Sequence, residues 1–308
     1  MALNNLGAVQ LQRGRVAEAQ RLLRDALRLR REVLPPDDPA LAETLMNLGV
    51  LAQNLRRRSL ASSLFQEALA IRQAAWPDID HPFTAQAMSS VANMEHDAGD
   101  IEGAFSMAED ALAMRRRLFA GAPHPDLAES LNNVAHMHAV GGRLHKATDL
   151  WKEAIDVLIP AVGYNAPDLA TCFDNLAQAS SALGELEQAR PAAQTAVRIA
   201  EQALGEDHPS LPQYLSTQAL VMAMSGDRAG AWDCLRRARM VEEAAYWRVV
   251  RMSSARGRAA YMGATRSLVD AMLSMVLSAE TAPTSAELVE VADLVLRRKR
   301  VELETRMA

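Results

Sequence analysis

The sequence predicts an all-α protein, a solenoid of about six helix-turn-helix repeats with a helical extension at its C-terminal end. The first observation is a five-residue phrase that returns at steps of 42 or 43 residues. The second is a set of glycine, alanine and proline positions that keep fixed distances from this phrase. Self-similarity at a constant period of this length is typical of units that stack and bury a continuous core.

The phrase carries apolar residues at its first and fourth positions, mainly polar residues between them and a small residue at its end. Its most regular copy is Leu131-Asn132-Asn133-Val134-Ala135. Each copy defines one repeat unit. The six copies occupy residues 3–7, 45–49, 88–92, 131–135, 173–177 and 215–219.

The first helix of each unit is predicted to begin at a proline, six residues before the phrase. Proline suits the first helical position because the N–H that it lacks would have no partner there. Asp38 precedes the first of these prolines and is expected to cap its helix. His81, His124 and His208 hold the same place in later units and are interpreted as capping or packing residues. The prolines are Pro39, Pro82, Pro125, Pro167 and Pro209.

A glycine seven residues after the small residue predicts the turn between the two helices of a unit. Glycine adopts the left-handed conformation that closes a helix, so Arg56, the one exception, should cost about 1 kcal/mol. Two alanine positions follow in every unit and predict close helix contacts. They are Ala19, Ala61, Ala104, Ala147, Ala189 and Ala231, then Ala26, Ala68, Ala111, Ala154, Ala196 and Ala238.

These residues resemble the tetratricopeptide repeat, in the longer form found in kinesin light chains. The pattern HPxxAxxLNNLAxxxxxxGxxxEA is matched from His124-Pro125 through Asn132-Asn133 to Gly142. The resemblance covers about residues 1–240. It implies a right-handed superhelix in which the first helix of each unit lines a concave groove. The first unit is truncated at Met1, so we expect upstream chain or a packing partner to cover that end.

Residues 241–308 depart from the repeat and predict a helical extension that seals the last unit. Thr284 and Glu287 form a capping-box pattern at the start of its final helix. Residues 254–271 and 292–300 resemble the linker of bacterial CHAT proteins, which joins tetratricopeptide repeats to a caspase-like protease domain. That resemblance implies the sensor portion of such a protease. The catalytic His and Cys of the family lie further downstream, so no catalytic residue is carried over.

Composition excludes several classes of protein. The chain has 308 residues, 49% hydrophobic and 23% charged, with a net charge of −5. This balance favours neither nucleic acid nor an anionic membrane, and no apolar run is long enough to span a bilayer. No signal peptide is apparent, so we expect a cytoplasmic protein. The two cysteines, Cys172 and Cys234, are interpreted as core residues, and we expect no metal or cofactor.

The predicted function lies on the exposed side of the first helices. At about 100° per residue, one column of side chains opposite the core is rich in amides. Amides both donate and accept, so they suit the backbone of an extended peptide, and in kinesin-light-chain repeats the matching column holds peptide backbone. The alternative is that these amides only brace neighbouring helices. The candidate binding residues are Asn5, Asn47, Asn93, His96, Asn132, Asn133, His136, Asp174, Asn175 and Gln178.

The charges of this surface predict the kind of partner. Its acidic residues are Glu43, Asp97, Glu129 and Asp174, and its columns contain no Lys or Arg. A carboxylate clamp needs cationic donors, so we expect a neutral or basic partner segment. Two functions follow: the sensor portion of a CHAT-type protease system, or a free-standing adaptor that bridges two proteins. An enzyme within these residues is the third and least supported alternative.

Overall fold

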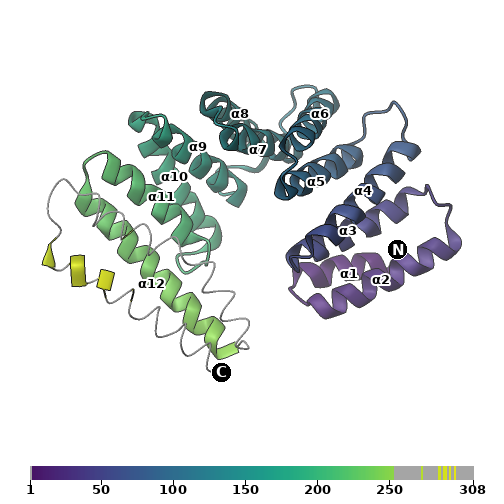
Figure 1. Cartoon of the computed structure of the whole chain (residues 1–308), viewed down its shortest axis with the longest axis horizontal. Coiled ribbons are helices and arrows are strands. Elements are labelled where there is room, and N and C mark those ends of the chain that lie inside the picture. Colours follow the sequence, from purple (N-terminus) through teal and green to yellow (C-terminus); the bar gives the residue numbers. More distant parts are fainter. Residues whose placement is uncertain are drawn as a thin grey trace. The chain divides into compact units, whose positions relative to one another are not determined.

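The computed structural model describes residues 2–252 and, beyond them, residues 272, 284, 285, 287–289, 291, 292 and 295; of residues 246–252 it describes the backbone alone. Every regular element in these residues is an α-helix, as predicted, and no strand occurs among them (Figure 1). The contacts divide the chain into two compact units, Met1–Gly141 and Gly142–Ala308. We describe each unit by itself.

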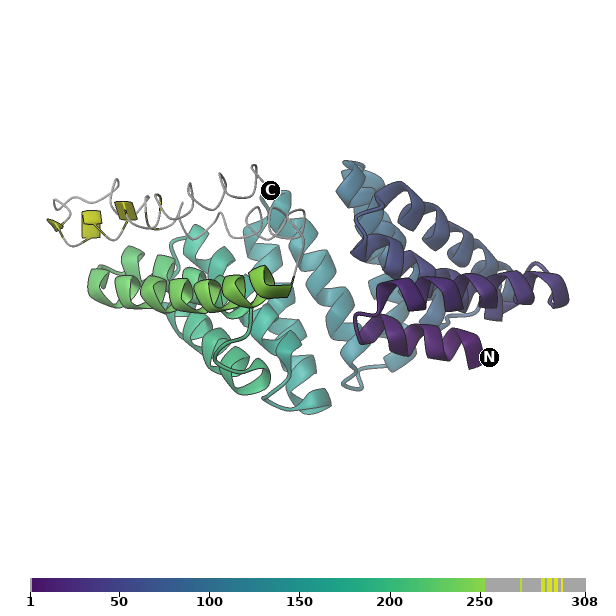
Figure 2. The ribbon, with the colours of Figure 1, turned by 90° about the horizontal axis from the view of Figure 1, so that it is seen from below.

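The first unit consists of three helical hairpins and one further helix. Within it, α1 packs on α2, α3 on α4 and α5 on α6, while α2, α4 and α6 each pack on the helix that follows them. The N-terminal hairpin is seen from below in Figure 2. The helices are α1 (Ala2–Gln12), α2 (Val16–Val33), α3 (Pro39–Asn54), α4 (Arg58–Ala75), α5 (Pro82–Ala98), α6 (Ile101–Phe119) and α7 (Pro125–Val140).

The second unit repeats the same arrangement. Helix α8 packs on α9, α9 forms a hairpin with α10, α10 packs on α11, and α11 forms a hairpin with α12. The predicted boundary at residue 240 lies within α12, which continues the last repeat. The helices are α8 (Leu144–Val162), α9 (Pro167–Ala182), α10 (Leu186–Leu204), α11 (Leu211–Met224) and α12 (Arg228–Met252).

The turn within each hairpin has the conformation that the glycine positions predict. Gly14, Gly99, Gly142, Gly184 and Gly226 all have positive φ, between 72° and 93°. Arg56 has a φ of 55° and therefore takes the left-handed conformation without the freedom of glycine. At Gly14, Gly99, Gly184 and Gly226, which lie inside one compact unit each, this turn geometry explains why the second helix of the hairpin turns back along the first.

The hydrogen bonds at the helix starts confirm the predicted caps in most repeats. Asp38 Oδ1 accepts from Ala40 N at 2.8 Å, while His81 Nδ1 and His124 Nδ1 each accept from the amide two residues on at 3.2 Å. Pro209 is different, because it lies in the turn before α11 rather than at its start. A helix beginning at Pro209 would place Pro212 where an N–H must donate, so α11 begins at Leu211 instead.

The positions that the sequence reserves for small residues lie in the core. All six alanines of the first predicted column have 0% exposure, and those of the second are buried as well. Small residues are needed at the end of the phrase too: a Cβ on Gly49 would lie 2.4 Å from Phe65 Cε1. Short side chains at these places allow the helix axes to approach closely.

The C-terminal extension is described at a few residues. There Thr284 N donates to Glu287 Oε2 at 2.7 Å and Glu287 N donates to Thr284 Oγ1 at 3.2 Å, which confirms the capping box. Arg228, at the start of α12, donates to both Glu287 oxygens at 3.1 Å. The CHAT-like stretch 254–271 lies outside the described residues, as does most of 292–300. Among the described helices, none combines the length and apolar character needed to cross a membrane.

Candidate peptide-binding surface

The predicted surface lies on α1, α3, α5 and α7 in the first unit and on α9 in the second. The four asparagines of its central column are accessible: Asn5 is exposed, whereas Asn47, Asn133 and Asn175 are half-buried. The column therefore does not point into the hydrophobic core. The environment of the other candidate residues differs from repeat to repeat.

The asparagines of the first two repeats are linked to one another. Asn4 is 1% exposed, and its Nδ2 donates to Asn5 Oδ1 at 3.4 Å. Asn47 Nδ2 donates to Asn4 Oδ1 at 3.1 Å, from α3 to α1. At this junction the amides brace neighbouring helices, which is the alternative that the sequence left open.

Two histidines meet where α5 and α7 are in contact. The ring centroids of His96 and His136 lie 5.9 Å apart, with the planes tilted by 53°. Burial, and then the charge of His96, lower the pKa of His136 below its ordinary value. Asn93 and Asn132 are half-buried on the same two helices. The described residues contain no group of three possible metal ligands, so this pair does not belong to a metal cluster among them.

Asp174 is not available to a partner, because it is 0% exposed. Its Oδ2 accepts from Gln178 Nε2 at 2.8 Å and from Gln213 Nε2 at 3.2 Å, which ties α9 to α11. Burial raises the pKa of Asp174, while the hydrogen bonds from Thr217 and the two glutamines act in the opposite direction. Its place on the predicted binding surface is therefore corrected to an inter-repeat brace, in which Gln178 takes part.

Sequence reasoning missed three buried arginines that recur at steps of 42 and 43 residues. Each lies near the end of one repeat and donates to a backbone carbonyl in the first turn of the next helix. Arg30 bonds Ala40 O, Arg72 bonds Phe83 O, and Arg115 bonds Asp126 O. Their periodicity in the sequence was the available signal. In the second unit the corresponding residues are Leu158 and Ala200, both buried, and Glu242, which is half-buried.

These arginines change the charge balance of the surface. Glu43 lies 3.0 Å from Arg30 Nη2, and Glu129 lies 3.2 Å from Arg115 Nη1. The expectation that no cation opposes these carboxylates was wrong, because the arginines reach them from the preceding helices. Arg72 faces Gln86 instead, and its burial lowers its pKa to about 10.

The cysteines lie in the core, as predicted. Burial raises the pKa of Cys172 to about 12 and also raises the pKa of Cys234. Since the thiolate is the reactive form, both thiols are poor nucleophiles.

Solved structures of several other proteins share this fold. The TPR-like repeats of a putative kinesin light chain from Podosopora anserina align with a TM-score of 0.56 at 20% identity, over 68% of this chain and 98% of that one. Apo RapI aligns with a TM-score of 0.66 at 12% identity, over 98% of each chain. A Rap protein in complex with competence and sporulation factor aligns with a TM-score of 0.61 at 15% identity, over 99% of this chain and 75% of that one.

Comparison with protein families gives the assignment. No curated protein matches the chain. The tetratricopeptide repeat family matches residues 1–74, 61–117 and 126–202, which together are more than half of the sequence. The helical hairpins, the left-handed turns and the buried alanine positions agree with that match. The chain therefore belongs to the tetratricopeptide repeat family.

Proposed function

We propose that this protein is a non-catalytic scaffold that binds a protein or peptide segment along the exposed side of its first helices. The observation that carries the proposal is the polar strip on α5 and α7. There the imidazoles of His96 and His136 lie 5.9 Å apart, and Asn93 and Asn132 lie on the same helices. Amide and imidazole groups on these two helices offer both donors and acceptors, which suits a peptide backbone.

The partner segment is neutral or basic in this proposal. The ion pairs of Glu43 and Glu129 leave Asp97 as the exposed acidic residue of the predicted surface without an ion pair among the described residues. A single carboxylate attracts a basic group weakly, so hydrogen bonding to the peptide is the main contribution. The Rap protein solved with competence and sporulation factor supports a binding role by likeness of fold.

The biological setting is the second part of the proposal. Residues 254–271 and 292–300 resemble the linker of CHAT proteins, which favours a role as the cytoplasmic sensor of a caspase-like protease. A free-standing adaptor is the competing function. Reading the gene beyond Ala308 distinguishes them, because a reading frame that continues into a His/Cys protease domain supports the sensor and a stop codon supports the adaptor.

Binding through the amide column is tested with a double variant, Asn133→Ala with Asn175→Ala. Affinity purification from the source cells, quantified by mass spectrometry, should show partners that the wild type enriches and the variant loses. The control variant is Gln66→Ala with Gln194→Ala, which changes exposed amides on α4 and α10, one in each unit. Equal enrichment by all three proteins, with unchanged thermal unfolding, contradicts a binding role for the column.

A further inference from the structure

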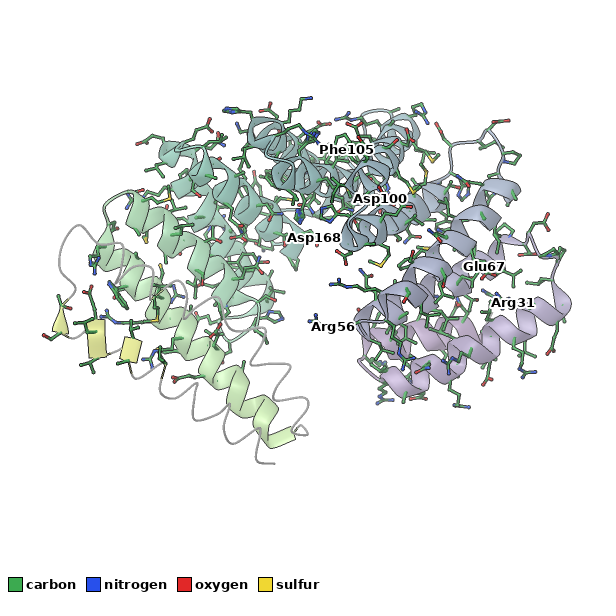
Figure 3. All side chains as sticks on the ribbon, in the orientation of Figure 1. Arg31, Arg56, Glu67, Asp100, Phe105 and Asp168 are labelled. Carbon is green, nitrogen blue, oxygen red and sulfur yellow. The ribbon has the colours of Figure 1, made fainter. Side chains whose placement is uncertain are left out.

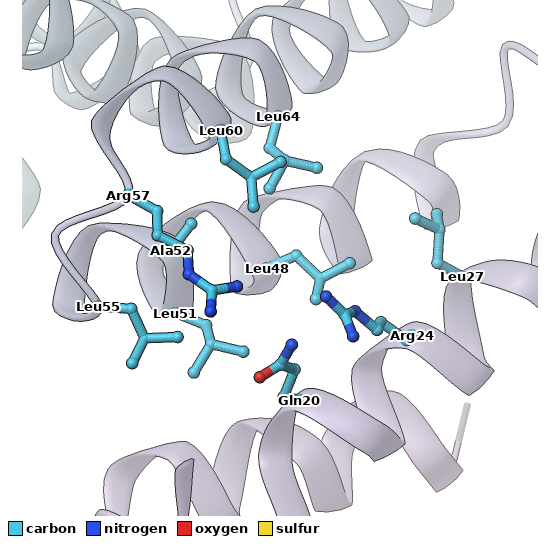
Figure 4. A pocket seen from close by; sticks show the side chains of 10 residues that line it. All are labelled: Gln20, Arg24, Leu27, Leu48, Leu51, Ala52, Leu55, Arg57, Leu60 and Leu64. Carbon is cyan, nitrogen blue, oxygen red and sulfur yellow. The ribbon is translucent and has the colours of Figure 1, made fainter. Parts of the chain in front are cut away.

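A pocket of about 190 Å³ opens in the first unit between α2, α3 and α4 (Figure 4). Its apolar lining comes from all three helices, and Leu60 at its edge is 43% exposed. None of its lining residues belongs to the predicted peptide-binding surface. They are Gln20, Arg24, Leu27, Leu48, Leu51, Ala52, Leu55, Arg57, Leu60 and Leu64.

At one later junction, two aromatic side chains lie at the positions that correspond to two residues of the pocket lining. Two repeats later, Phe105 of α6 packs edge-on against His138 of α7, with ring centroids 4.9 Å apart. By the repeat period, Gln20 corresponds to Phe105 and Ala52 corresponds to His138. An amide and a methyl group leave space that two rings occupy at the later junction. An engineered apolar cavity of about 150 Å³ binds benzene, so this pocket has room for one aliphatic side chain.

The charges around the pocket have one sign. Arg24 and Arg57 are the charged residues of its lining, and no carboxylate lines it. In Figure 4 both guanidinium groups and the Gln20 amide point into the space between the leucines. With the Gln20 amide rotated by 180° from the orientation drawn in Figure 4, its oxygen accepts from Arg24 Nη2 and Nη1 at 2.7 and 2.9 Å. This partner of Arg24 is neutral.

The arginines next to the pocket also lack a carboxylate partner among the described residues. Arg56 precedes Arg57 in the turn, and Arg58 is the first residue of α4. The three make no ion pair with any described residue. By contrast, Arg31 of α2 and Glu67 of α4, both labelled in Figure 3, pair with one another at 2.6 Å. Arg31 therefore has a carboxylate partner on α4, whereas Arg24 and Arg57 at the pocket have none among the described residues.

We propose that this pocket is a second docking site, which takes a leucine side chain of a partner segment that has acidic residues on both sides of that leucine. The leucine enters the apolar space, and the flanking carboxylates meet Arg24 from α2 and Arg57 from the turn before α4. Two arginines, one on α2 and one in the turn before α4, match a segment with two carboxylates better than a fatty acid with one. The site is independent of the amide column and selects the opposite charge.

The proposal is tested by fluorescence anisotropy with the full chain and a labelled synthetic peptide that carries leucine between glutamates. One comparison peptide has glutamine for each glutamate, and another has alanine for the leucine. We expect the acidic leucine peptide to bind at least about tenfold more tightly than either, with an affinity that falls as salt rises. Equal affinity for the glutamine peptide overturns the proposal, as does displacement by decanoate at similar concentrations.

Matched variants locate the binding. Leu60→Glu should weaken binding about tenfold or more, while Leu29→Glu, a leucine of nearly equal exposure (41%) on α2, should leave it unchanged. Gln20→Phe with Ala52→His copies the rings of the later junction and should abolish binding in a folded chain. The site is refuted if Leu29→Glu no longer binds the peptide. It is also refuted if Gln20→Phe with Ala52→His still binds it. Asn133→Ala with Asn175→Ala should bind the acidic leucine peptide as the wild type does. A failure of the proposed amide column can therefore be told apart from a failure of the pocket.

Discussion

Arg115 Nη1 lies 3.2 Å from Glu129 Oε2, and the Arg115 side chain is 1% exposed. The same nitrogen donates to Ser130 Oγ at 2.7 Å and to Asp126 O at 2.7 Å. One guanidinium on α6 thus holds the first two turns of α7. Because hydrogen bonds from a buried charged group are among the stronger ones, this contact joins two repeats more firmly than apolar packing alone.

Arg115→Ala should lower the free energy of unfolding by about 2–4 kcal/mol, because it removes these bonds and leaves a space in the core. Urea unfolding followed by circular dichroism measures the effect. Arg58→Ala, at an exposed position of α4, is the control and should change stability by less than about 0.5 kcal/mol. Similar midpoints for the two variants would show that the contact is not important for stability.

Arg56→Gly should stabilise the protein by about 1 kcal/mol. The φ of 55° is unfavourable for an arginine and acceptable for glycine, and this gain exceeds the extra chain entropy of glycine. Thermal unfolding measures it. Arg57→Gly is the control, since its φ of −90° offers no such relief and it should not stabilise. A lower melting temperature for Arg56→Gly would disprove strain in this turn.

Ala104→Leu should destabilise the first unit by about 1–3 kcal/mol, because this side chain has 0% exposure and added methyl groups overpack the contact. Ala113→Leu, on the exposed side of the same helix, provides the comparison and should be close to neutral. Unfolding in urea gives both values. If the two variants are equally stable, the assignment of the alanine column to close helix contacts is wrong.

Asp174 predicts a pH dependence in the second unit. Its pKa is raised in the folded state, so the folded protein binds the proton more tightly and stability falls as pH rises. The loss begins near the ordinary aspartate pKa of about 3.9 and is complete once the pH has passed the raised value. Asp174→Asn should remove this trend when unfolding is measured across that window.

The matched control is Asp168→Asn, an exposed residue of the same helix α9, labelled in Figure 3. It makes the same change in net charge without touching the brace between α9 and α11. If the wild type and Asp174→Asn keep a constant stability difference across the acidic range, burial does not control the protonation of Asp174.

The repeat architecture was predictable from the sequence because it depends on residues whose role is steric. Glycine at a left-handed turn, alanine at a helix contact and proline near a helix start each act through their own backbone or size. The environment of the candidate site was harder to predict. A helical wheel gives the direction of Asp174 but not its depth, and it gives no sign that glutamines from α9 and α11 surround it.

Long side chains explain the remaining differences between the predicted binding surface and the structure. Arg30 and Arg115 belong to helices that were predicted to lie outside the binding surface, yet their guanidinium groups reach Glu43 and Glu129 on it. The pocket beside Leu60 was also missed, because it arises from what Gln20 and Ala52 fail to fill. Both features appear only when each repeat is compared with its neighbours position by position.

Between successive repeats, Arg30, Arg72 and Arg115 of the first unit give way to Leu158 and Ala200 in the second, and only the last repeat again has a charged residue there, Glu242. We therefore expect the two units to respond differently to cold. Apolar association weakens as temperature falls, whereas charge-assisted bonds do not share this dependence. On cooling, the carboxy-terminal repeats should therefore unfold before the amino-terminal ones. The two parts of one polypeptide would then have different cold-denaturation temperatures.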